Sequence, residues 1–502
     1  MQKRKAACHG APEGKALMND GKAIITVLTP NSTPRRFLRD LPAPPGLPLI
    51  GNLLQLERDR LHLTLEEWRR TYGDYYRFRN VNREVLVVSD PETIATMLRD
   101  RPDGFLRTSR LGSIAREMGF NGVFTANGEE WRRQRPMVMA GLDPKHIKTY
   151  FPALVRVTQR FAGRWRRAAE ARSAIDLQAD LMRYTVDVTA GLAFGADINT
   201  IESDHEVIQQ HLDKVLPALS RRLFAPFRYW RYLKLPADRA LARHLVELHH
   251  AVNGFIATAR SRVDANPSLR ANPSNLIEAM IAARDTEGSG VNDADVAGNV
   301  LTMLLAGEDT TANTLAWMIY LLGRNPQALA RARDEVRAVL GAEAFPSQYE
   351  QLAKLPFVEA CANETMRLRP VAPLLIIEAG RPSVVAGIEI PARQVIICLL
   401  RPGATDERHF PDPQKFDPAR WLDPAAKSAT SAKRVAMPFG AGPRLCPGRY
   451  LAMLEMKMVI AMLLASFELE NVGTSDGAEP REHMAFTMAP VGLRMQLGVR
   501  HA

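Results

Sequence analysis

Apolar positions recur along most of the chain at the spacing of a buried helix face. This period marks five long segments, at residues 93–100, 181–195, 240–263, 299–323 and 328–341. Shorter apolar runs predict strands at residues 75–80, 83–89, 384–391, 394–400 and 493–499. No repeat, Gly/Ser linker or charge block follows residue 41. The pattern therefore predicts one large, mainly α-helical body with small β-sheets.

The beginning of the chain has a different pattern. Residues 1–40 are basic and lack an apolar core of signal-peptide length, so we expect a mobile tail there. The proline-rich residues 41–52 then lead stiffly into the fold. Apolar runs stop well short of the roughly 18 residues that a membrane-spanning helix needs. We therefore expect no integral membrane anchor.

Composition narrows the function classes only slightly. The net charge of +11 favours an acidic partner, but over 502 residues it does not choose among nucleic acid, an anionic membrane and an acidic protein. The four cysteines Cys8, Cys361, Cys398 and Cys446 lie far apart and form no CxxC pair. This spacing argues against a structural zinc site and a disulfide framework, and it suits a reducing compartment.

One of these cysteines stands in a glycine-rich loop. The stretch PFGAGPRLCPGRYLA (residues 438–452) places Cys446 two residues after Arg444 and just before a segment with helical period. The dipole and free N–H groups of a helix N-terminus favour thiolate over thiol, and a lone thiolate can bind a metal. For any single cysteine, a buried inert thiol is the alternative. The ordered surroundings favour a metal ligand, with Arg444 placed to bind a carboxylate of the same cofactor.

A polar group also interrupts a long apolar helix. The stretch LLAGEDTTANTL (residues 304–315) brings Asp309 and Thr310 into this helix, where buried polar groups cost free energy unless they are bonded or functional. The Thr310 hydroxyl can bond the carbonyl of Ala306, while Gly307 removes a side chain that would fill the gap. The result is a polar notch suited to proton delivery. A helix N-cap or a helix–helix interface is the alternative.

Two more motifs contain charged side chains that could bind one another or an anionic group. Glu364 and Arg367 in ETMRLRP share one helix face, and Arg420 in FDPARW could complete a buried ion-pair set. Trp131 and Arg135 in WRRQR lie one turn apart and could reach one anionic group. Taken singly, a surface ion pair and a surface cation–π pair are the alternatives.

Read in order, WRRQR, AGEDTT, ETMR, FDPARW and FGAGPRLCPG resemble the signature of the cytochrome P-450 family. The resemblance covers the chain from residue 41 onward. It implies a single triangular, mainly α-helical fold that holds haem b between two long helices. The haem domain would span residues 41–502, and Cys446 would be the proximal thiolate ligand of the iron.

The resemblance implies roles for the other motif residues. Asp309 and Thr310 would deliver protons to dioxygen, and Glu364, Arg367 and Arg420 would be structural. The residues expected to bind the haem and its propionates, or to form the oxygen groove, are Trp131, Arg135, Ala306, Gly307, Phe439, Arg444 and Gly448.

One position departs from the family pattern. Many relatives place arginine or histidine for a propionate on the strand after the ETMR helix, whereas this chain has Ile377 in PLLIIEAG. Propionate binding from that strand is therefore in question. The family's recognition segments imply an apolar pocket, which leaves terpenes, steroids, fatty acids and polyketides open. Its expected lining is Ile114, Met118, Phe120, Phe124, Leu301, Leu305, Ala306, Val371, Leu374, Leu375, Phe486 and Thr487.

The implied activity is insertion of one atom of dioxygen into a C–H or C=C bond of a small apolar substrate. The thiolate would favour cleavage of the O–O bond. The alternatives are a peroxide-driven member, a non-oxygenating isomerase or dehydratase of the same fold, and a haem-thiolate sensor or binding protein. The first two usually depart from an acid–threonine pair such as Asp309 and Thr310, which favours the monooxygenase.

Electrons are expected from separate proteins, because the sequence shows no flavin or iron–sulfur motif. NAD(P)H would supply them through a ferredoxin or flavodoxin and its reductase. Basic residues expected on the proximal face would steer such an acidic protein. They are Arg132, Arg133, Lys433, Arg434, Arg449 and Lys457. We expect a cytoplasmic monomer with no nucleic-acid partner, and the basic tail leaves import into an organelle open.

Overall fold

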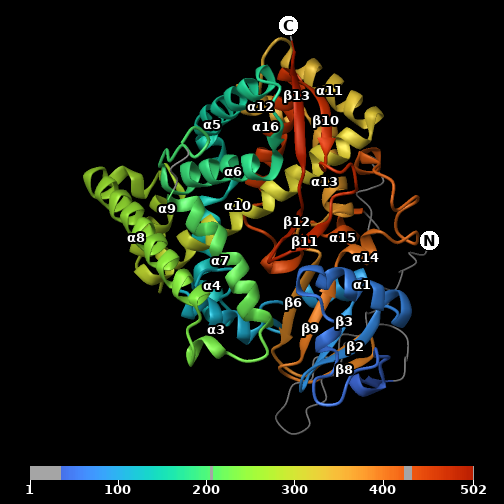
Figure 1. The fold of residues 1–502 in the computed structure, drawn as a ribbon. Helices are drawn as coiled ribbons and strands as arrows, with labels where there is room; N and C mark the ends of the chain where they lie inside the picture. Colours follow the sequence, from blue (N-terminus) through green and yellow to red (C-terminus); the bar gives the residue numbers. More distant parts are fainter. Residues whose placement is uncertain (1–34, 204–206, 423–431, 501–502) are drawn as a thin grey trace, which may run out of the picture.

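Segments with helical period form most of the protein. The structure is a computed structural model and describes residues 35–203, 207–422 and 432–500. Its longest helix, α10 (Asp293–Arg324), crosses the middle of the molecule (Figure 1). This helix is apolar on nearly every side because α6 (Leu177–Phe194), α13 (Pro356–Leu368) and α16 (Arg449–Ser466) pack against it. The main core is therefore built around α10.

The other helices surround this centre. Two of them begin at aspartates, Asp90 before α2 and Asp143 before α5, whose carboxylates accept the N–H of the third residue that follows. The bounds are α1 (Leu61–Tyr72), α2 (Pro91–Arg99), α3 (Ser109–Glu117), α4 (Gly128–Gly141), α5 (Pro144–Glu170), α7 (Val207–Phe224), α8 (Pro236–Ala265), α9 (Leu276–Asp285), α11 (Pro326–Leu340), α12 (Tyr349–Ala353), α14 (Arg401–Ala404) and α15 (Ala432–Ala436).

Within the described residues, the strands form four sheets. Their orders are β2-β3-β9-β6-β4, β1-β8-β7, β10-β13-β5 and β11-β12. The bounds are β1 (Arg36–Phe37), β2 (Tyr75–Asn80), β3 (Arg83–Val88), β4 (Phe105–Arg107), β5 (Ile175–Asp176), β6 (Leu374–Ala379), β7 (Ser383–Val385), β8 (Ile388–Ile390), β9 (Val395–Leu399), β10 (Phe467–Gly473), β11 (Glu482–Met484), β12 (Met488–Pro490) and β13 (Arg494–Val499). The five-stranded sheet lies at the lower right of Figure 1, beyond one end of the helical body.

The mainly α-helical fold with small sheets is confirmed. The segment predicted as a helix at residues 299–323 lies within α10, and the strand predicted at residues 75–80 is β2. In the part of the chain that the structure describes, no helix is long and apolar enough to cross a bilayer.

The boundary of the expected N-terminal tail needs correction. Arg36 and Phe37 form β1, which pairs in parallel with Ile388 and Glu389 of β8. Leu38 follows and is buried against the five-stranded sheet. The chain has therefore joined the fold before residue 40, while residues 1–34 lie outside the described residues.

Candidate functional site

The Cys446 loop has the tight backbone path expected of it. Gly440 and Gly442 have positive φ angles of 77° and 70°, and a Cβ atom at Gly442 would lie 2.2 Å from the carbonyl oxygen of Leu98. The backbone N–H of Cys446 donates to the carbonyl of Phe439 at 3.0 Å. The helix α16 begins three residues after the cysteine. The loop therefore holds the thiol at the start of a helix, as predicted.

Burial opposes ionisation of this thiol. It raises the pKa of Cys446, while the backbone N–H of Gly448 and the guanidinium groups of Arg135 and Arg449 act in the opposite direction. The N–H group at the helix start thus favours the thiolate, as predicted, but burial outweighs its effect in the protein alone. A bound metal cation would reverse this balance, because a coordinating thiol is deprotonated.

The other described cysteines have different surroundings. Cys361 and Cys398 are fully buried, and burial raises the pKa of Cys398 to about 12. Both lie in apolar clusters. Such thiols pack as small apolar side chains. Cys446, half-buried and beside arginines, is therefore the described cysteine suited to bind a metal.

Three predicted propionate ligands meet beside this loop. The guanidinium of Arg444 lies 5.0 Å from the ring centre of Trp131 and donates to the backbone carbonyl of Ala126. The guanidinium of Arg135 lies 6.0 Å from the same ring and donates to the carbonyl of Leu445 at 2.5 Å. The two arginines and the indole, which come from α4 and from the Cys446 loop, thus share one neighbourhood, as the sequence predicts.

A further arginine at this place is absent from the sequence prediction. Arg107 on β4 lies directly opposite Ile377 of β6, so both side chains leave the same face of the sheet. Its guanidinium covers the ring of Phe124 at 4.3 Å. Burial lowers the pKa of Arg107 to about 10, and burial together with Arg107 and Arg135 lowers the pKa of Arg444 to about 9. The β4–β6 pairing, which sequence patterns do not specify, brings this charge to the position facing Ile377.

The polar notch in α10 has the predicted hydrogen bond. The hydroxyl of Thr310 donates to the carbonyl of Ala306 at 2.8 Å. Ala306 is exposed although Leu304 and Leu305 just before it are buried. The proposed role of Gly307 needs correction, because a Cβ atom there would lie 2.5 Å from the Thr189 hydroxyl on α6. Gly307 therefore allows α6 and α10 to pack closely and does not widen the notch.

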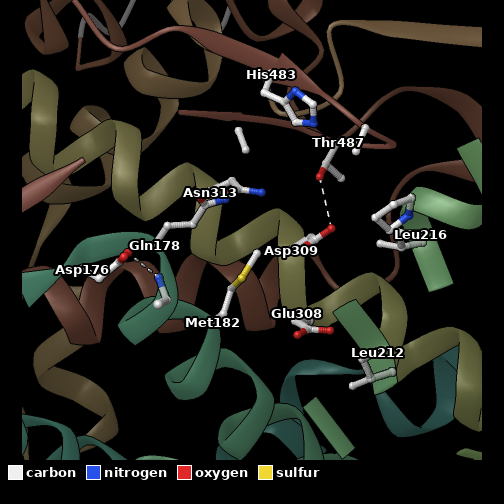
Figure 2. A pocket seen from close by; sticks show the side chains of 14 residues that line it. Asp176, Gln178, Met182, Leu212, Leu216, Glu308, Asp309, Asn313, His483 and Thr487 are labelled. Carbon is white, nitrogen blue, oxygen red and sulfur yellow. Dashed lines mark hydrogen bonds between the residues drawn. The ribbon is translucent and has the colours of Figure 1, made fainter. Parts of the chain in front are cut away.

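Asp309 lines a cavity of about 420 Å³ between α6, α7, α10 and the β11–β12 hairpin (Figure 2). The hydroxyl of Thr487 on the hairpin donates to Oδ2 of Asp309 at 3.3 Å. The other polar side chains that line the cavity are Asp176, Gln178, Glu308, Asn313 and His483. Thr487, which the sequence predicts as a contact in an apolar pocket, is therefore a partner of the acid in polar surroundings.

A buried polar network fixes the segment before α4 against α10. Oδ1 of Asn299 on α10 accepts the backbone N–H of Val123 at 2.7 Å, and its Nδ2 donates to Oε1 of Gln134 at 3.1 Å. Gln134 in turn donates to Asp295 at 2.8 Å. Close approach of this segment also needs Gly122, where a Cβ atom would lie 2.1 Å from the Thr302 hydroxyl. The network thereby positions the helix that carries Trp131 and Arg135.

Most of the expected substrate-lining residues belong to one apolar cluster. Its buried members include Ile114, Met118, Phe120, Leu301 and Leu305, with Phe124 and Phe486 packed against it. The rings of Phe124 and Phe486 meet edge to face at 5.8 Å. Val371 is half-buried at the other side of the hairpin, where its carbonyl accepts the N–H of Met488 at 2.8 Å.

The expectation that Leu374 and Leu375 line the same pocket wall is wrong. Leu374 and Leu375 are neighbours on β6 and point to opposite faces of the sheet. Leu374 packs with Met484 of the hairpin, whereas Leu375 packs with the cluster that contains Ile94 of α2 and Ile377. The two leucines therefore do not share one pocket wall.

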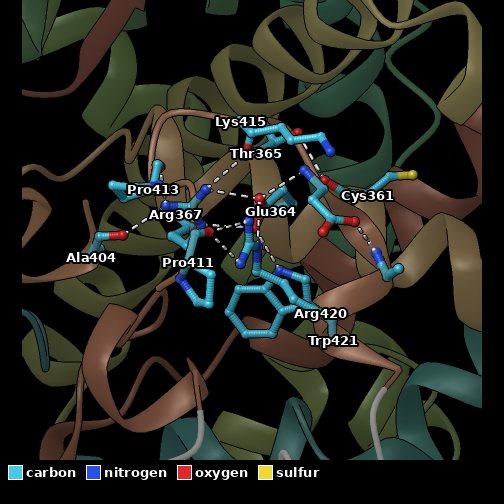
Figure 3. Close-up of polar contacts among 12 residues, drawn as sticks. Cys361, Glu364, Thr365, Arg367, Ala404, Pro411, Pro413, Lys415, Arg420 and Trp421 are labelled. Carbon is cyan, nitrogen blue, oxygen red and sulfur yellow. Dashed lines mark hydrogen bonds and ion pairs between the residues drawn. The ribbon is translucent and has the colours of Figure 1, made fainter. Parts of the chain in front are cut away.

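The predicted buried ion-pair set is present (Figure 3). Arg367 binds both carboxylate oxygens of Glu364 at 2.8 Å, and Nε of Arg420 donates to the same carboxylate at 3.0 Å. The indole N–H of Trp421 and the backbone N–H of Asp417 also donate to it, at 2.8 and 2.9 Å. The side chains of Glu364 and Arg367 are fully buried. The set thus ties α13 to the segment that leads toward Cys446.

Nearly the whole described chain matches one family model. The model is described as Cytochrome P450, and it covers residues 41–497. The chain belongs to the cytochrome P450 family. It is thus an oxidoreductase that incorporates oxygen from molecular oxygen, and the motif resemblance is confirmed.

Known relatives of this cytochrome P450 extend over most of the chain. It is 28% identical to cyclooctatin synthase of Streptomyces melanosporofaciens, over 94% of this chain and 98% of that one. It is 27% identical to a self-sufficient cytochrome P450 monooxygenase of Penicillium freii, over 92% of this chain but 43% of that enzyme. A solved cytochrome P450 heme domain has the same fold, with a TM-score of 0.79, 23% identity and coverage of 92% and 98%.

Haem b is the cofactor that membership of the cytochrome P450 family implies, and the residues of this chain fit it. Arg107, Arg135 and Arg444 bring positive charges together beside Cys446, and Nε of Arg444 is buried without a hydrogen-bond partner among the described residues. Such a group suits the two carboxylates of a haem. The residues that would hold the haem are thus Cys446, Trp131 and the three arginines.

The basic surface predicted for a redox partner of this cytochrome P450 is smaller than expected. Lys457 is 8% exposed, and its ammonium pairs with Glu359 at 2.6 Å and donates to the carbonyl of Leu352. It is therefore a buried structural residue. Arg132 and Arg133 pair with acidic side chains, Arg434 is exposed, and Arg449 lies beside the carbonyl of Cys446. The side chain of Lys433 lies outside the described residues.

Proposed function

We propose that this protein is a haem-thiolate monooxygenase that inserts one atom of dioxygen into a C–H or C=C bond of a small apolar substrate. The observation that carries the proposal is the Thr310 hydroxyl on the Ala306 carbonyl, next to Asp309, in the central helix α10. A thiolate-ligated haem would supply the oxidising chemistry when bound. The polypeptide supplies binding, orientation and controlled protons.

Proton supply would pass through the acid on α10. Asp309 lies between a polar cavity and Thr310, the next residue in the chain, and the Thr487 hydroxyl holds its carboxylate. A carboxyl group can relay a proton from such polar surroundings to a neighbouring hydroxyl. The apolar cluster on the adjoining part of α10 limits other routes for water. Peroxide-driven and sensor functions would not need this arrangement.

Replacing Thr310 by alanine should lower the yield of oxygenated product by about a hundredfold, the lower range for a lost acid–base group. Consumption of reductant should continue, because haem binding does not use this hydroxyl. The measurement is product formed per NAD(P)H oxidised, with ferredoxin and flavodoxin donors compared in parallel. Those arms also test the proposal that a separate protein delivers the electrons.

Thr314→Ala is the matched control for this experiment. Its hydroxyl makes the same kind of bond one turn later, to the carbonyl of Thr310 at 2.7 Å, and it is buried. Its product yield should stay close to that of the unchanged protein. Equal yields from all three proteins would remove Thr310 from proton delivery.

The substrate would be an apolar molecule rich in hydrocarbon. The supporting observation is the set of apolar side chains from α3, the following loop and α10, closed by Phe124 against Phe486. The relatives that make cyclooctatin or oxidise cyclooctat-9-en-7-ol, both from Streptomyces melanosporofaciens, add support for a cyclic alkene or its alcohol.

An absorption titration of the ferric protein tests this function. Terpenes, steroids, fatty acids and aromatics are added in turn, and one class should shift the Soret band toward the high-spin position. That class should then be oxygenated at a rate that rises with its binding. A haem protein that binds these molecules but never converts them, with any donor, would be a binding protein or sensor.

A further inference from the structure

The β11–β12 hairpin, which leads to Thr487, is small and pairs with no other strand among the described residues. It has three residue pairs, beginning with Glu482 opposite Pro490. A two-stranded hairpin of this size is at best marginally stable by itself. The place of Thr487 beside Asp309 therefore depends on what holds the hairpin.

Charged side chains hold the root of this hairpin. The carboxylate of Glu482 on β11 is 9% exposed, accepts Nη1 of Arg401 at 2.7 and 2.8 Å, and bonds Nε2 of His62 at 2.7 Å. Arg369 approaches the same carboxylate at 3.3 Å. Arg401 also binds Glu66 through Nε and Nη2, at 3.0 and 2.8 Å. Since these partners come from α1, α14 and the end of α13, one carboxylate joins the hairpin to three separate parts of the fold.

These bonds are charged. Burial raises the pKa of Glu482, but the bonds from His62 and Arg401 outweigh burial and bring the pKa to about 2. The carboxylate is therefore ionised at physiological pH, and hydrogen bonds to an ionised group are about twice as strong as neutral ones. Elsewhere on the hairpin, its backbone makes neutral bonds to the Val371 carbonyl and the Ser220 hydroxyl. The bonds of Glu482 thus hold the hairpin more firmly than these neutral bonds do.

The tip of the hairpin depends on this support. The hydroxyl of Thr487 donates to Oδ2 of Asp309 at 3.3 Å (Figure 2). Hydroxyl hydrogen bonds usually span about 2.5 to 3.0 Å, so a small shift of the hairpin would break this one. The pair of Met484 with Met488 directly precedes and follows the tip, so a displaced strand would carry Thr487 with it.

We propose that Glu482 is a positioning residue for proton delivery: it fixes the root of the hairpin and so keeps the Thr487 hydroxyl on the carboxylate of Asp309. The proposal rests on the proposed function, in which Asp309 relays the proton. Glu482 does not line the cavity of Asp309, so it acts through the hairpin and not on the proton itself. This role explains why a charged set is buried at the root of a hairpin whose tip holds the acid.

Glu482→Gln tests the proposal because it keeps the shape of the side chain and removes its charge. The substrate is the compound that gives the largest Soret shift in the titration. The folded holoprotein should form about tenfold less product per NAD(P)H oxidised, a smaller loss than for Thr310→Ala, because the acid is displaced and not removed. Product formation should also slow more in D₂O than it does in the unchanged protein, since proton delivery then limits the rate.

A second variant shows whether the effect passes through the hairpin tip. Thr487→Val removes the hydroxyl that Glu482 is proposed to position, and it should lower the yield by a similar factor. The double variant should then be no worse than either single variant, because both changes act on one contact. Independent effects would instead multiply to about a hundredfold. That result, or a normal yield from Glu482→Gln, would overturn the proposal.

Glu479→Gln is the matched control. Glu479 lies three residues before Glu482 and pairs with the same Arg369, but its side chain is 66% exposed. Its product yield and its response to D₂O should equal those of the unchanged protein. A Glu482→Gln protein that unfolds at lower urea concentration but gives a normal yield would show a purely structural role and refute the proposal.

Amide hydrogen exchange supplies a readout that needs no turnover. Residues 482–490 should exchange faster in the Glu482→Gln holoprotein than in Glu479→Gln, and equal exchange would overturn the proposal. If Glu482→Gln does not fold, Glu482→Asp decides, because it keeps the charge but shortens the link by one methylene group: a reduced yield supports the proposal, and a normal yield refutes it. If the unchanged protein forms no product with any donor, the proposed function fails and the role in proton delivery fails with it, whereas the exchange result still shows whether Glu482 anchors the hairpin.

Discussion

Replacing Cys446 by serine should abolish monooxygenase turnover while leaving a folded protein. Serine is only slightly smaller than cysteine. Because the side chain of Cys446 is half-buried near the start of α16, the substitution should change the packing little. The hydroxyl, however, is a far weaker donor to iron than a thiolate. We expect a loss of activity of more than about a hundredfold, beyond the range for changes around metal ligands.

Absorption spectroscopy separates this effect from unfolding. The ferrous carbon monoxide complex of the unchanged protein should show the Soret band of a thiolate-ligated haem, and Cys446→Ser should lose it. The matched controls are Cys361→Ser and Cys398→Ser, which change buried thiols packed in apolar clusters. They should keep the band. Its survival in Cys446→Ser, or its loss in a control, would mean that another group binds the iron.

Local chemistry in the sequence predicts the parts of the site that act within one short segment. The Thr310 bond to Ala306 spans one helical turn, so its spacing alone specifies it. The Cys446 loop is likewise set by its own glycines and by the helix that follows. The Glu364–Arg367 contact is also local, at i and i+3, and the third partner Arg420 follows from the order of the motifs.

Contacts between segments that are distant in the chain could not be predicted from the sequence. Arg107 gains its place through the pairing of β4 with β6. Asn299 lies in an apolar run, where nothing in its spacing indicates that it accepts the N–H of Val123. The prediction that Lys457 lies on the surface was wrong for a similar reason, because its partner Glu359 comes from another helix.

Glycine 307 and Leu375 show a second limit, which is the direction of a side chain. The sequence shows that residue 307 has no side chain, but only the fold shows that the side chain of Thr189 on α6 occupies this space. For Leu375, alternation along β6 excludes a shared wall with Leu374, and it does so only once the strand and its two covered faces are known. The direction of these side chains thus becomes known only from the packing of the elements that carry them.

Replacing Glu364 by glutamine should cost about 3–5 kcal/mol of the free energy of unfolding, because it leaves buried positive charges without their counter-charge. The carboxylate accepts bonds from Arg367, Arg420, Trp421 and the backbone of Asp417. The glutamine amide has nearly the same shape, but it offers one oxygen in place of two. Its NH₂ group would also face the N–H groups of these partners, which are themselves donors. Since domains are stable by only about 5–15 kcal/mol, much of the variant should be unfolded or lost on expression.

Urea unfolding followed by circular dichroism measures this loss in the holoprotein. Glu389→Gln is the matched control: it removes an exposed ion pair with Arg35 at 3.4 Å and should cost less than about 0.5 kcal/mol. The fraction of Glu364→Gln that folds should still show the thiolate-type Soret band, because the carboxylate acts through the packing of α13 and not on the iron. A cost below about 1 kcal/mol would show that solvent reaches these arginines and that the network is no more than a surface ion pair.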